Sequence, residues 1–359
     1  MSEKVVGPVT FRAQRLHLEI TLTALFACIA AVSSAQSVST IERAAEQILR
    51  HVTSDGAIVM GPLPAKRSHL IPYFASLAAR GLVAAFAETR DARFLDAAKH
   101  WVVWHETHMN ADGTIYDFDG APGAWKPTGD YDSTDSYAAT YLELILAIHR
   151  VAPDRDWLRL RLPAVRRAIA AIRLTLQLNG LTIAKPKWPV MYLMDNTETA
   201  AGLRAAEAVG RILGDAGLQR ETGAMADKSE QAIARELWDN TRQAYCVGLQ
   251  TDGAKVNDRQ EWYPYVMANL MAVGWLPPSE RHHAVLQRFK GKFSSGIPAS
   301  VRTENDLGRL VWWGIAARGA GDHKLLAEIA VKLAAFDARV KKFTNPALLG
   351  HLCRILARD

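Results

Sequence analysis

The chain has 359 residues, of which 49% are hydrophobic and 22% are charged. These fractions are ordinary for a globular protein and argue against a disordered, fibrous or polytopic membrane protein. The net charge is +6, but no basic run is interleaved with aromatic residues, so we expect no nucleic-acid partner.

The first 35 residues have the pattern of a secretory signal peptide. Three basic residues come first: Lys4, Arg12 and Arg15. An apolar run over residues 20–32 follows, and small residues end at Ala35. Because the run is shorter than the about 20 residues of a transmembrane helix, we expect cleavage near Ala35 and no stable membrane insertion afterwards. The mature chain, residues 36–359, is then periplasmic or secreted. Lipid attachment at Cys28 is a less favoured alternative.

Beyond the signal, apolar residues recur with helical spacing almost throughout. The starts, stops and periodicity of these segments predict twelve helices. They cover approximately Thr40 to Val52, His69 to Thr89, Ala92 to Met109, Ser133 to Val151, Asp154 to Leu178, Thr197 to Leu213, Leu218 to Asn240, Trp262 to Trp275, Glu280 to Phe293, Asn305 to Arg318, His323 to Val340 and Pro346 to Ala357.

Two kinds of helix alternate along the chain. The even-numbered ones are apolar nearly all round, as in residues 77–86 and 265–274, and must therefore be buried. The odd-numbered ones carry charge on one face and belong against solvent. Four outer helices are followed by Asp-Gly or Asn-Gly turns, which begin at Asp55, Asp112, Asn179 and Asp252. This repeated hairpin predicts an all-α, (α/α)6 toroid of six outer and inner pairs in a single domain.

Acidic residues gather at the predicted starts of four inner helices. Three helices have two acids, which are Asp132 and Asp135, Asp195 and Glu198, and Asp258 and Glu261, and the fourth has Thr303 followed by Asp306. All four share the spacing of a capping box, in which the two side chains satisfy the free backbone N–H groups of a helix start. In a toroid these starts surround one mouth, where carboxylates could also act as a general acid and a general base.

The second inner helix has further acids and rings around its start. Asp130 and Tyr131 precede it, Tyr137 follows Asp135, and Trp125 lies in the Gly-rich loop upstream. Aromatic residues in loops tend to face solvent or ligand, and their rings stack on sugars. The equivalent loops carry Trp188, Trp262 and Tyr263. Trp312 and Trp313 lie inside a predicted inner helix and are expected in the core instead.

Residues 68–147 resemble the six-hairpin glycosidase superfamily and, distantly, glycoside hydrolase family 8, which includes secreted endoglucanases. The similarity lies in the order of an outer helix over 94–109, the turn at Asp112, and an acidic helix start over 133–139. By that resemblance, Asp135 matches the conserved acid that contacts the sugar at the cleavage point.

The chain departs from family 8 at the first inner helix. The family places its general-acid glutamate there, and this chain has Arg67, Ser68 and His69. The donor would then come from Glu198 or Glu261.

We therefore expect an exported glycoside hydrolase that acts on a polysaccharide or oligosaccharide as a monomer. The catalytic candidates are Asp132, Asp135, Glu198 and Glu261. The candidates for substrate binding are Asp130, Tyr131, Tyr137, Trp125, His69, Arg67, Trp188, Asp195, Trp262 and Tyr263. We expect no cofactor and no metal, because no Cys or His residues have ligand-like spacing apart from the adjacent His282 and His283.

Two other functions stay open. A polysaccharide lyase or sugar epimerase could use the same fold, with Tyr73 or Tyr137 as the base. The cations available to neutralise a uronate are His69, Lys66 and Arg67. A non-catalytic glycan-binding protein of an exopolysaccharide system would use the acids only as helix caps. Cys246 and Cys353 are compatible with a disulfide or with two thiols.

Overall fold

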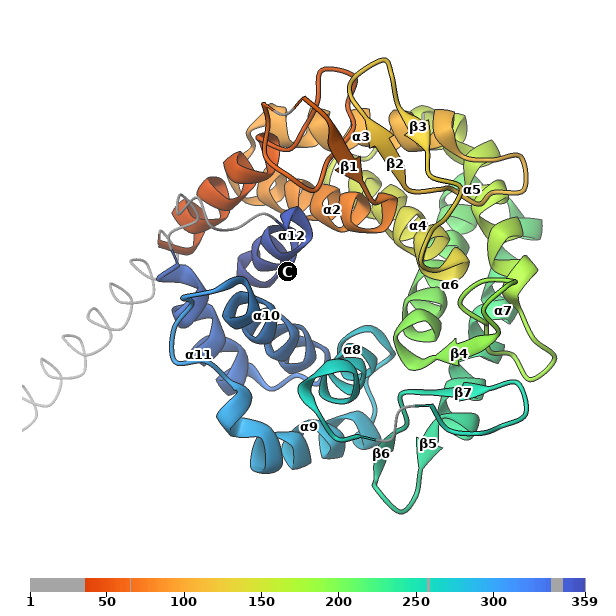
Figure 1. The fold of residues 1–359 in the computed structure, drawn as a ribbon, viewed down its shortest axis with the longest axis vertical. Coiled ribbons are helices and arrows are strands. Elements are labelled where there is room, and N and C mark those ends of the chain that lie inside the picture. Colours follow the sequence, from red (N-terminus) through yellow and green to blue (C-terminus); the bar gives the residue numbers. More distant parts are fainter. Residues whose placement is uncertain (1–35, 65, 257–258, 337–344, 359) are drawn as a thin grey trace, which may run out of the picture.

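Two concentric rings of helices make up the part of the chain that the structure describes (Figure 1). This computed structural model describes residues 36–359 apart from 65, 257–258, 337–344 and 359. The inner ring contains α2 (Pro72–Thr89), α4 (Thr134–Val151), α6 (Leu193–Leu213), α8 (Met267–Trp275), α10 (Glu304–Gly319) and α12 (Pro346–Leu356). The outer ring contains residues 36–49, α3 (Ala92–His108), α5 (Arg155–Thr175), α7 (Ala216–Glu236), α9 (Glu280–Phe293) and α11 (His323–Ala334). The predicted all-α (α/α)6 toroid is confirmed, while the predicted signal peptide lies outside the described residues.

Several helix boundaries differ from the predicted ones. α2 begins at Pro72 instead of His69, α7 ends at Glu236 instead of Asn240, and α11 ends at Ala334, before the predicted end at Val340. α6 begins at Leu193, four residues ahead of the predicted Thr197. A π-helical segment, η1 (Trp262–Val266), precedes α8. The start of α6 matters for function, because it places Asp195 inside the helix instead of in the loop before it.

Small residues let the inner helices pack closely and close the ring. A Cβ added at Gly202 of α6 would lie 2.6 Å from the Cα of Ala139 in α4. A Cβ added at Gly81 of α2 would lie 2.2 Å from the Cα of Gly350 in α12. Glycine at these crossings brings the helix backbones into contact, so the first and last inner helices meet and the toroid closes.

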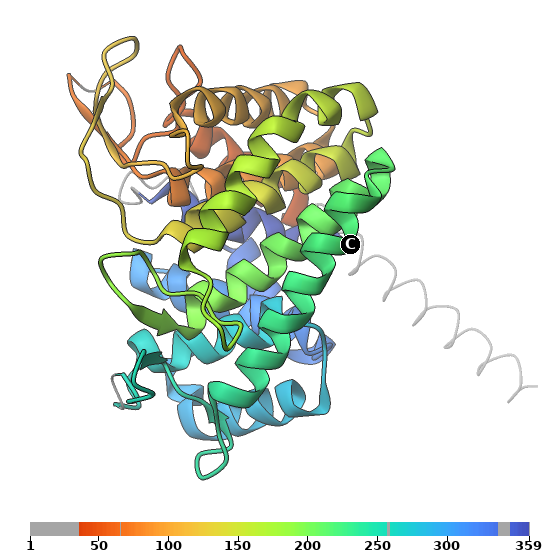
Figure 2. The same cartoon turned by 90° about the vertical axis from the view of Figure 1, so that its right-hand side faces the viewer.

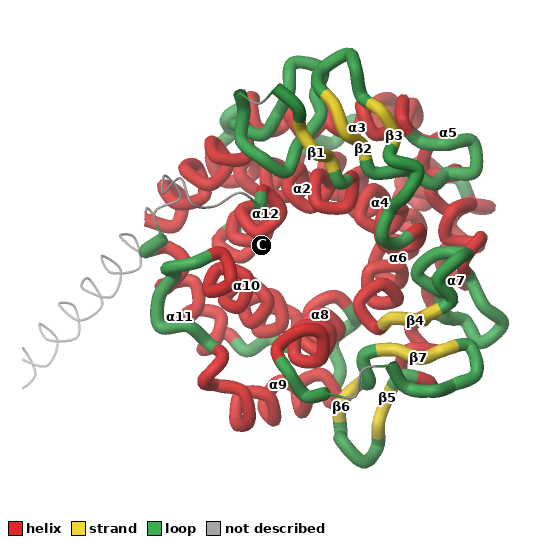
Figure 3. The backbone as a smooth tube through the Cα atoms, viewed as in Figure 1, coloured by secondary structure: helices red, strands yellow, loops and turns green. Residues whose placement is uncertain are grey.

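Short antiparallel strands lie in the loops (Figure 3). They are β1 (Ser68–Leu70), β2 (Phe118–Gly120) and β3 (Lys126–Pro127), which form one sheet, β4 (Val190–Tyr192) with β7 (Gly248–Gln250), and β5 (Trp238–Asp239) with β6 (Ala244–Tyr245). β1 and β4 run directly into α2 and α6. The loops that enter the inner helices gather at one end of the barrel in the side view (Figure 2). The predicted mouth of the toroid is therefore at that end.

Two global features complete the fold. Cys246 and Cys353 are buried thiols that form no disulfide with each other, which settles the alternative left open by the sequence. None of the described helices is both long enough and apolar enough to cross a membrane.

Candidate active site

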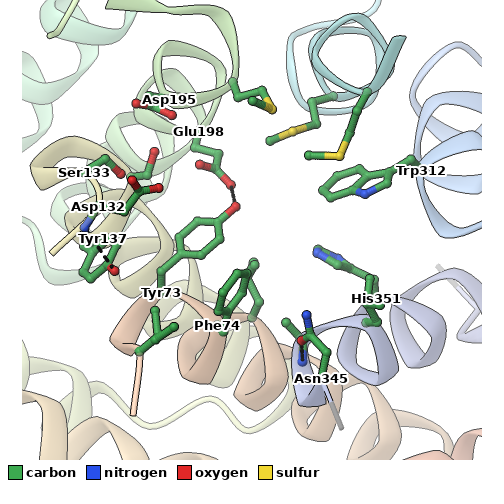
Figure 4. A pocket seen from close by; sticks show the side chains of 18 of the residues that line it. Tyr73, Phe74, Asp132, Ser133, Tyr137, Asp195, Glu198, Trp312, Asn345 and His351 are labelled. Carbon is green, nitrogen blue, oxygen red and sulfur yellow. Dashed lines mark hydrogen bonds between the residues drawn. The ribbon is translucent and has the colours of Figure 1, made fainter. Parts of the chain in front are cut away.

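A cavity of about 440 Å³ lies inside the inner ring (Figure 4). Side chains from each of the inner helices α2, α4, α6, α8, α10 and α12 line it. Four carboxyl groups are among them: Asp117, Asp132, Asp195 and Glu198. Three of these were predicted from the starts of the second and third inner helices, and the structure brings them into one cavity. Such a concave site with convergent titratable groups is the expected form of an active site.

Two of the predicted capping boxes, at the starts of α4 and α6, are not formed. Ser133, in extended backbone, is the N-cap of α4, and Tyr192 is that of α6; neither helix start has a side-chain cap hydrogen bond. Only Thr303 and Asp306 form the predicted box, at α10. Asp258 lies outside the described residues. The acids at the starts of α4 and α6 therefore need an explanation other than helix capping.

Glu198 is a buried carboxyl group in the second turn of α6. It is 1% exposed, and its Oε1 accepts a 2.6 Å hydrogen bond from the Tyr73 hydroxyl of α2. Burial raises the pKa of Glu198 to about 8, although the bond from Tyr73 opposes this shift. The group therefore holds a proton at neutral pH, which is what a general acid requires.

Asp195 lies one helical turn before Glu198, so both side chains are on the same face of α6. Burial raises the pKa of Asp195 well above its ordinary value, and the charges of Asp135 and Glu198 raise it further. Asp195 therefore adds a second carboxyl group with a raised pKa to the same side of the cavity as Glu198.

Asp117 and Tyr137 also line the cavity. The Tyr137 hydroxyl donates a 2.9 Å hydrogen bond to Asp117 Oδ1 and accepts a 3.4 Å bond from the backbone N–H of Asp132. Burial raises the pKa of Asp117 to about 6, and the Tyr137 bond lowers it in part. The side chain of Asp132 is exposed and faces the cavity. The Tyr137 hydroxyl thus links Asp117 to the backbone of Asp132 and helps to hold Asp132 in place.

Asp135 lies behind the cavity wall and does not line it. It is fully buried and accepts hydrogen bonds from Thr182 Oγ1 at 2.5 Å and from the backbone N–H of Ser136 at 3.0 Å. Burial raises the pKa of Asp135 to about 7. Thr182 in turn donates its backbone N–H to Asn196 of α6 at 2.7 Å. Asp135 therefore ties the start of α4 to the start of α6.

The remaining predicted residues divide between the cavity and its surroundings. Tyr263 is 63% exposed and lines the cavity. Glu261 is exposed and outside the lining, at the N-cap of η1. Next to it, Trp262 packs under the guanidinium of Arg309, 5.1 Å from the ring centroid.

Several predicted binding residues bind other protein groups in the loops. The indole N–H of Trp125 donates to Asp55 and that of Trp188 to Tyr192. Asp130 pairs with Lys185, whose ammonium also lies over the Tyr131 ring. Arg67 and His69 pair with Asp119 of β2, at 3.6 Å and 3.0 Å. All of these lie outside the cavity lining.

Sequence reasoning missed part of the lining. Asp117 lies in the loop that follows the Asp112-Gly113 turn and leads to the second inner helix. An acidic residue in such a loop was the sequence signal that could have identified it. Trp312, expected in the core, is 7% exposed but lines the cavity. Met194, Met267 and Met271 gave no signal, because a methionine on an inner helix has the pattern of an ordinary core residue. Among the described side chains, no group of three His, Cys, Asp or Glu residues could hold a metal ion.

Several solved structures with a similar fold are glycosidases. A glycoside hydrolase family 63 mannosylglycerate hydrolase from Thermus thermophilus, in complex with glucose, is 11% identical with a TM-score of 0.65, over 87% of this chain and 98% of that one. A β-1,3-1,4-glucanase from a Paenibacillus species is 11% identical with a TM-score of 0.63, over 91% and 93%. A rhamnosidase from Klebsiella oxytoca with rhamnose bound is 14% identical with a TM-score of 0.58, over 89% and 63%.

These similarities concern the fold. The resemblance to the six-hairpin glycosidases is confirmed at that level, whereas a place in family 8 stays a prediction. No protein-family model matches the chain, and no curated protein is similar to it in sequence. The function must therefore be argued from the cavity itself.

Proposed function

We propose that the protein is a glycoside hydrolase in which Glu198 is the general acid and Asp132 is the partner carboxylate. One observation carries this proposal: a buried carboxyl with a pKa of about 8 and an exposed carboxyl line the same cavity. Glycosidases divide the work of bond cleavage between two such groups in unlike environments.

In the proposed reaction, the proton of Glu198 passes to the glycosidic oxygen as the bond to the anomeric carbon breaks. Asp132 either accepts a proton from the attacking water or attacks the anomeric carbon itself. The first route inverts the anomeric configuration and the second retains it, so NMR of the first-formed product distinguishes them. Asp117 and Tyr137 hold the loop that carries Asp132.

Elimination or epimerisation is less well supported by these contacts. Tyr73 and Tyr137 donate hydrogen bonds to carboxyl groups, and burial raises the pKa of both phenols. A phenol with a raised pKa is a poor base at neutral pH. In the described chain the cavity lining contains no Lys or Arg to neutralise a uronate.

The test compares Glu198→Gln with Glu261→Gln, and Asp132→Asn with Asp130→Asn, on a panel of α- and β-linked oligosaccharides and glycosides. Loss of a general acid or base costs about 10²- to 10⁴-fold in rate. We expect this loss for Glu198→Gln and Asp132→Asn, and near-normal rates for the two control variants. Full activity of Glu198→Gln would refute the assignment. Glycan binding by every variant without turnover by any would instead identify a non-catalytic binding protein.

We also propose that the protein is exported and acts as a monomer. The basic residues and apolar run of the first 35 residues support export. Cell fractionation with N-terminal sequencing should recover a chain that begins near Gln36. Light scattering of that product should give the mass of one chain.

A further inference from the structure

The cavity has two chemically different walls (Figure 4). The acidic wall carries Asp132, Asp195 and Glu198 from the starts of α4 and α6. The facing part is apolar: Met267 and Met271 of α8 and Trp312 of α10, continued by Met194. In Figure 4 the methionine sulfur atoms and Trp312 lie on the far side of Glu198 from Asp132.

The apolar wall is only partly covered by protein. Met194 and Met267 are half-buried, so part of their apolar surface faces the cavity. Leaving such surface in water forgoes about 25 cal/mol for each Å². Methionine is also flexible and polarizable, and it adapts to apolar ligands of varied shape. Met271 and Trp312 are almost fully buried. Apolar lining of this kind beside a few polar groups is typical of ligand-binding pockets.

Two polar side chains lie near this wall, Asn345 and His351, and each has one atom bound by the protein. Asn345 Oδ1 caps α12 by accepting from the backbone N–H of Ala347 at 3.0 Å. His351 Nδ1 lies 3.2 Å from Arg354 Nη1, which donates to it. His351 Nε2 is buried and has no hydrogen-bond partner among the described residues. Met194, Met267 and Met271 themselves offer no strong hydrogen-bond partner, and the unpartnered His351 Nε2 cannot by itself satisfy the several hydroxyl groups of a sugar ring, each of which needs a partner when buried.

The order of the groups decides which part of a substrate meets this wall. A general acid lies beside the oxygen of the leaving group, and the second carboxylate lies across the sugar ring from it. With Asp132 on one side of Glu198, the leaving group extends to the other side. That side is the wall of Met194, Met267, Met271 and Trp312.

We propose that the substrate is a glycoside with an apolar leaving group, an alkyl or aryl aglycone, held against this methionine and tryptophan wall. The direction of the aglycone rests on the proposed hydrolase function. The apolar character of the subsite rests on the lining residues alone. The two can therefore be tested separately.

The experiment measures binding without turnover, using the Glu198→Gln protein and calorimetry. The probes are methyl and n-octyl glycosides of glucose, galactose and mannose in both anomeric forms, below the micelle concentration of the octyl compounds. Each fully buried methylene contributes about fourfold in affinity. We expect the octyl compound of the preferred sugar to bind at least tenfold more tightly than the methyl compound, with one site per chain.

A matched pair of variants locates the effect. In the Glu198→Gln protein, the further substitution Met267→Gln should reduce the ratio of octyl to methyl glycoside affinity several-fold. The affinity for the methyl glycoside should stay unchanged. Adding Met267→Leu, which keeps an apolar side chain, should preserve the ratio. Thermal unfolding of both proteins shows that they are folded.

A ratio near one for every sugar would overturn the inference. So would a high ratio that Met267→Gln does not change, because the alkyl chain would then bind elsewhere. If the wild-type protein cleaves oligosaccharides while the ratio is near one, only this inference fails. If the ratio is high but no glycoside is cleaved, the hydrolase proposal fails and the apolar subsite stands.

Discussion

The hydroxyl of Tyr73 donates a 2.6 Å hydrogen bond to Oε1 of Glu198, although the two residues are 125 positions apart in sequence. The bond joins the first inner helix to the third across the cavity. Because a carboxylate accepts a hydrogen bond more strongly than a neutral carboxyl group does, the phenol favours the ionised form of Glu198. It thereby limits the rise in pKa that burial causes.

This contact predicts how Tyr73→Phe changes the pH dependence of hydrolysis. A general acid must be protonated, so the wild-type rate should fall as the pH rises through about 8, the pKa of Glu198. Removing the phenol removes a group that lowers this pKa. The alkaline limb of kcat/KM should therefore move to higher pH in Tyr73→Phe, as a pH–rate profile would measure.

Tyr137→Phe is the matched control for this shift. Tyr137 donates to Asp117 and not to Glu198. Its removal should leave the alkaline limb in place. An alkaline limb that moves to lower pH in Tyr73→Phe would contradict the role given to the bond.

Glu198→Gln should stabilise the folded protein, increasingly so as the pH rises. The pKa of Glu198 is raised from an ordinary 4.5 to about 8 in the fold. Below pH 4.5 both folded and unfolded states hold the proton, so ionisation of Glu198 does not change the free energy of unfolding there. Between these two pH values only the unfolded chain releases the proton, so the free energy of unfolding falls as the pH rises. Glutamine has no proton to release and avoids this loss.

Urea unfolding of Glu198→Gln and wild type at about pH 5, 7 and 9 measures the effect. The difference in the free energy of unfolding should grow in favour of the variant with each step. Glu261→Gln, at an exposed position, should show no such trend. A constant difference across the three pH values would mean that Glu198 is not a raised-pKa group.

How much the sequence reveals depends on the range of the contacts involved. The helices could be predicted from a local pattern, because buried positions recur with each helical turn and place apolar residues at regular spacing in the sequence. The spacing of Asp132 and Asp135 is equally local, and it predicted a capping box that the structure does not contain. Asp135 is occupied by Thr182, 47 positions away, in a contact that no local spacing encodes. Asp117 and the three methionine residues likewise come together only in the complete ring of helices, so their place in the cavity could not be predicted from local sequence.

Thr182→Val tests whether Asp135 ties α4 to α6. The change removes the hydroxyl that donates to Asp135 at 2.5 Å and leaves a buried carboxyl short of a donor. Such a loss costs about 1–3 kcal/mol, measurable by urea unfolding. Thr251→Val, at an exposed position, should change stability by less than about 0.5 kcal/mol. Equal effects of the two substitutions would argue against the proposed tie.

The close contact between α2 and α12, which closes the ring, can be tested by substitution at their crossing. In Gly81→Ala the new Cβ would lie 2.2 Å from the Cα and 2.8 Å from the carbonyl oxygen of Gly350. Both are backbone atoms, so the two helices must move apart, at a cost of about 1–3 kcal/mol or more. Gly291→Ala is the control, because no atom lies within 4 Å of its added Cβ on the exposed side of α9.

The control should gain up to about 1 kcal/mol, since alanine favours a helix more than glycine does. The two variants should therefore differ in sign in the free energy of unfolding. Tyr73 and His351 extend into the cavity from α2 and α12, so widening this crossing should also lower activity in Gly81→Ala but not in Gly291→Ala. A Gly81→Ala protein as stable and as active as Gly291→Ala would show that the crossing does not set the width of the cavity.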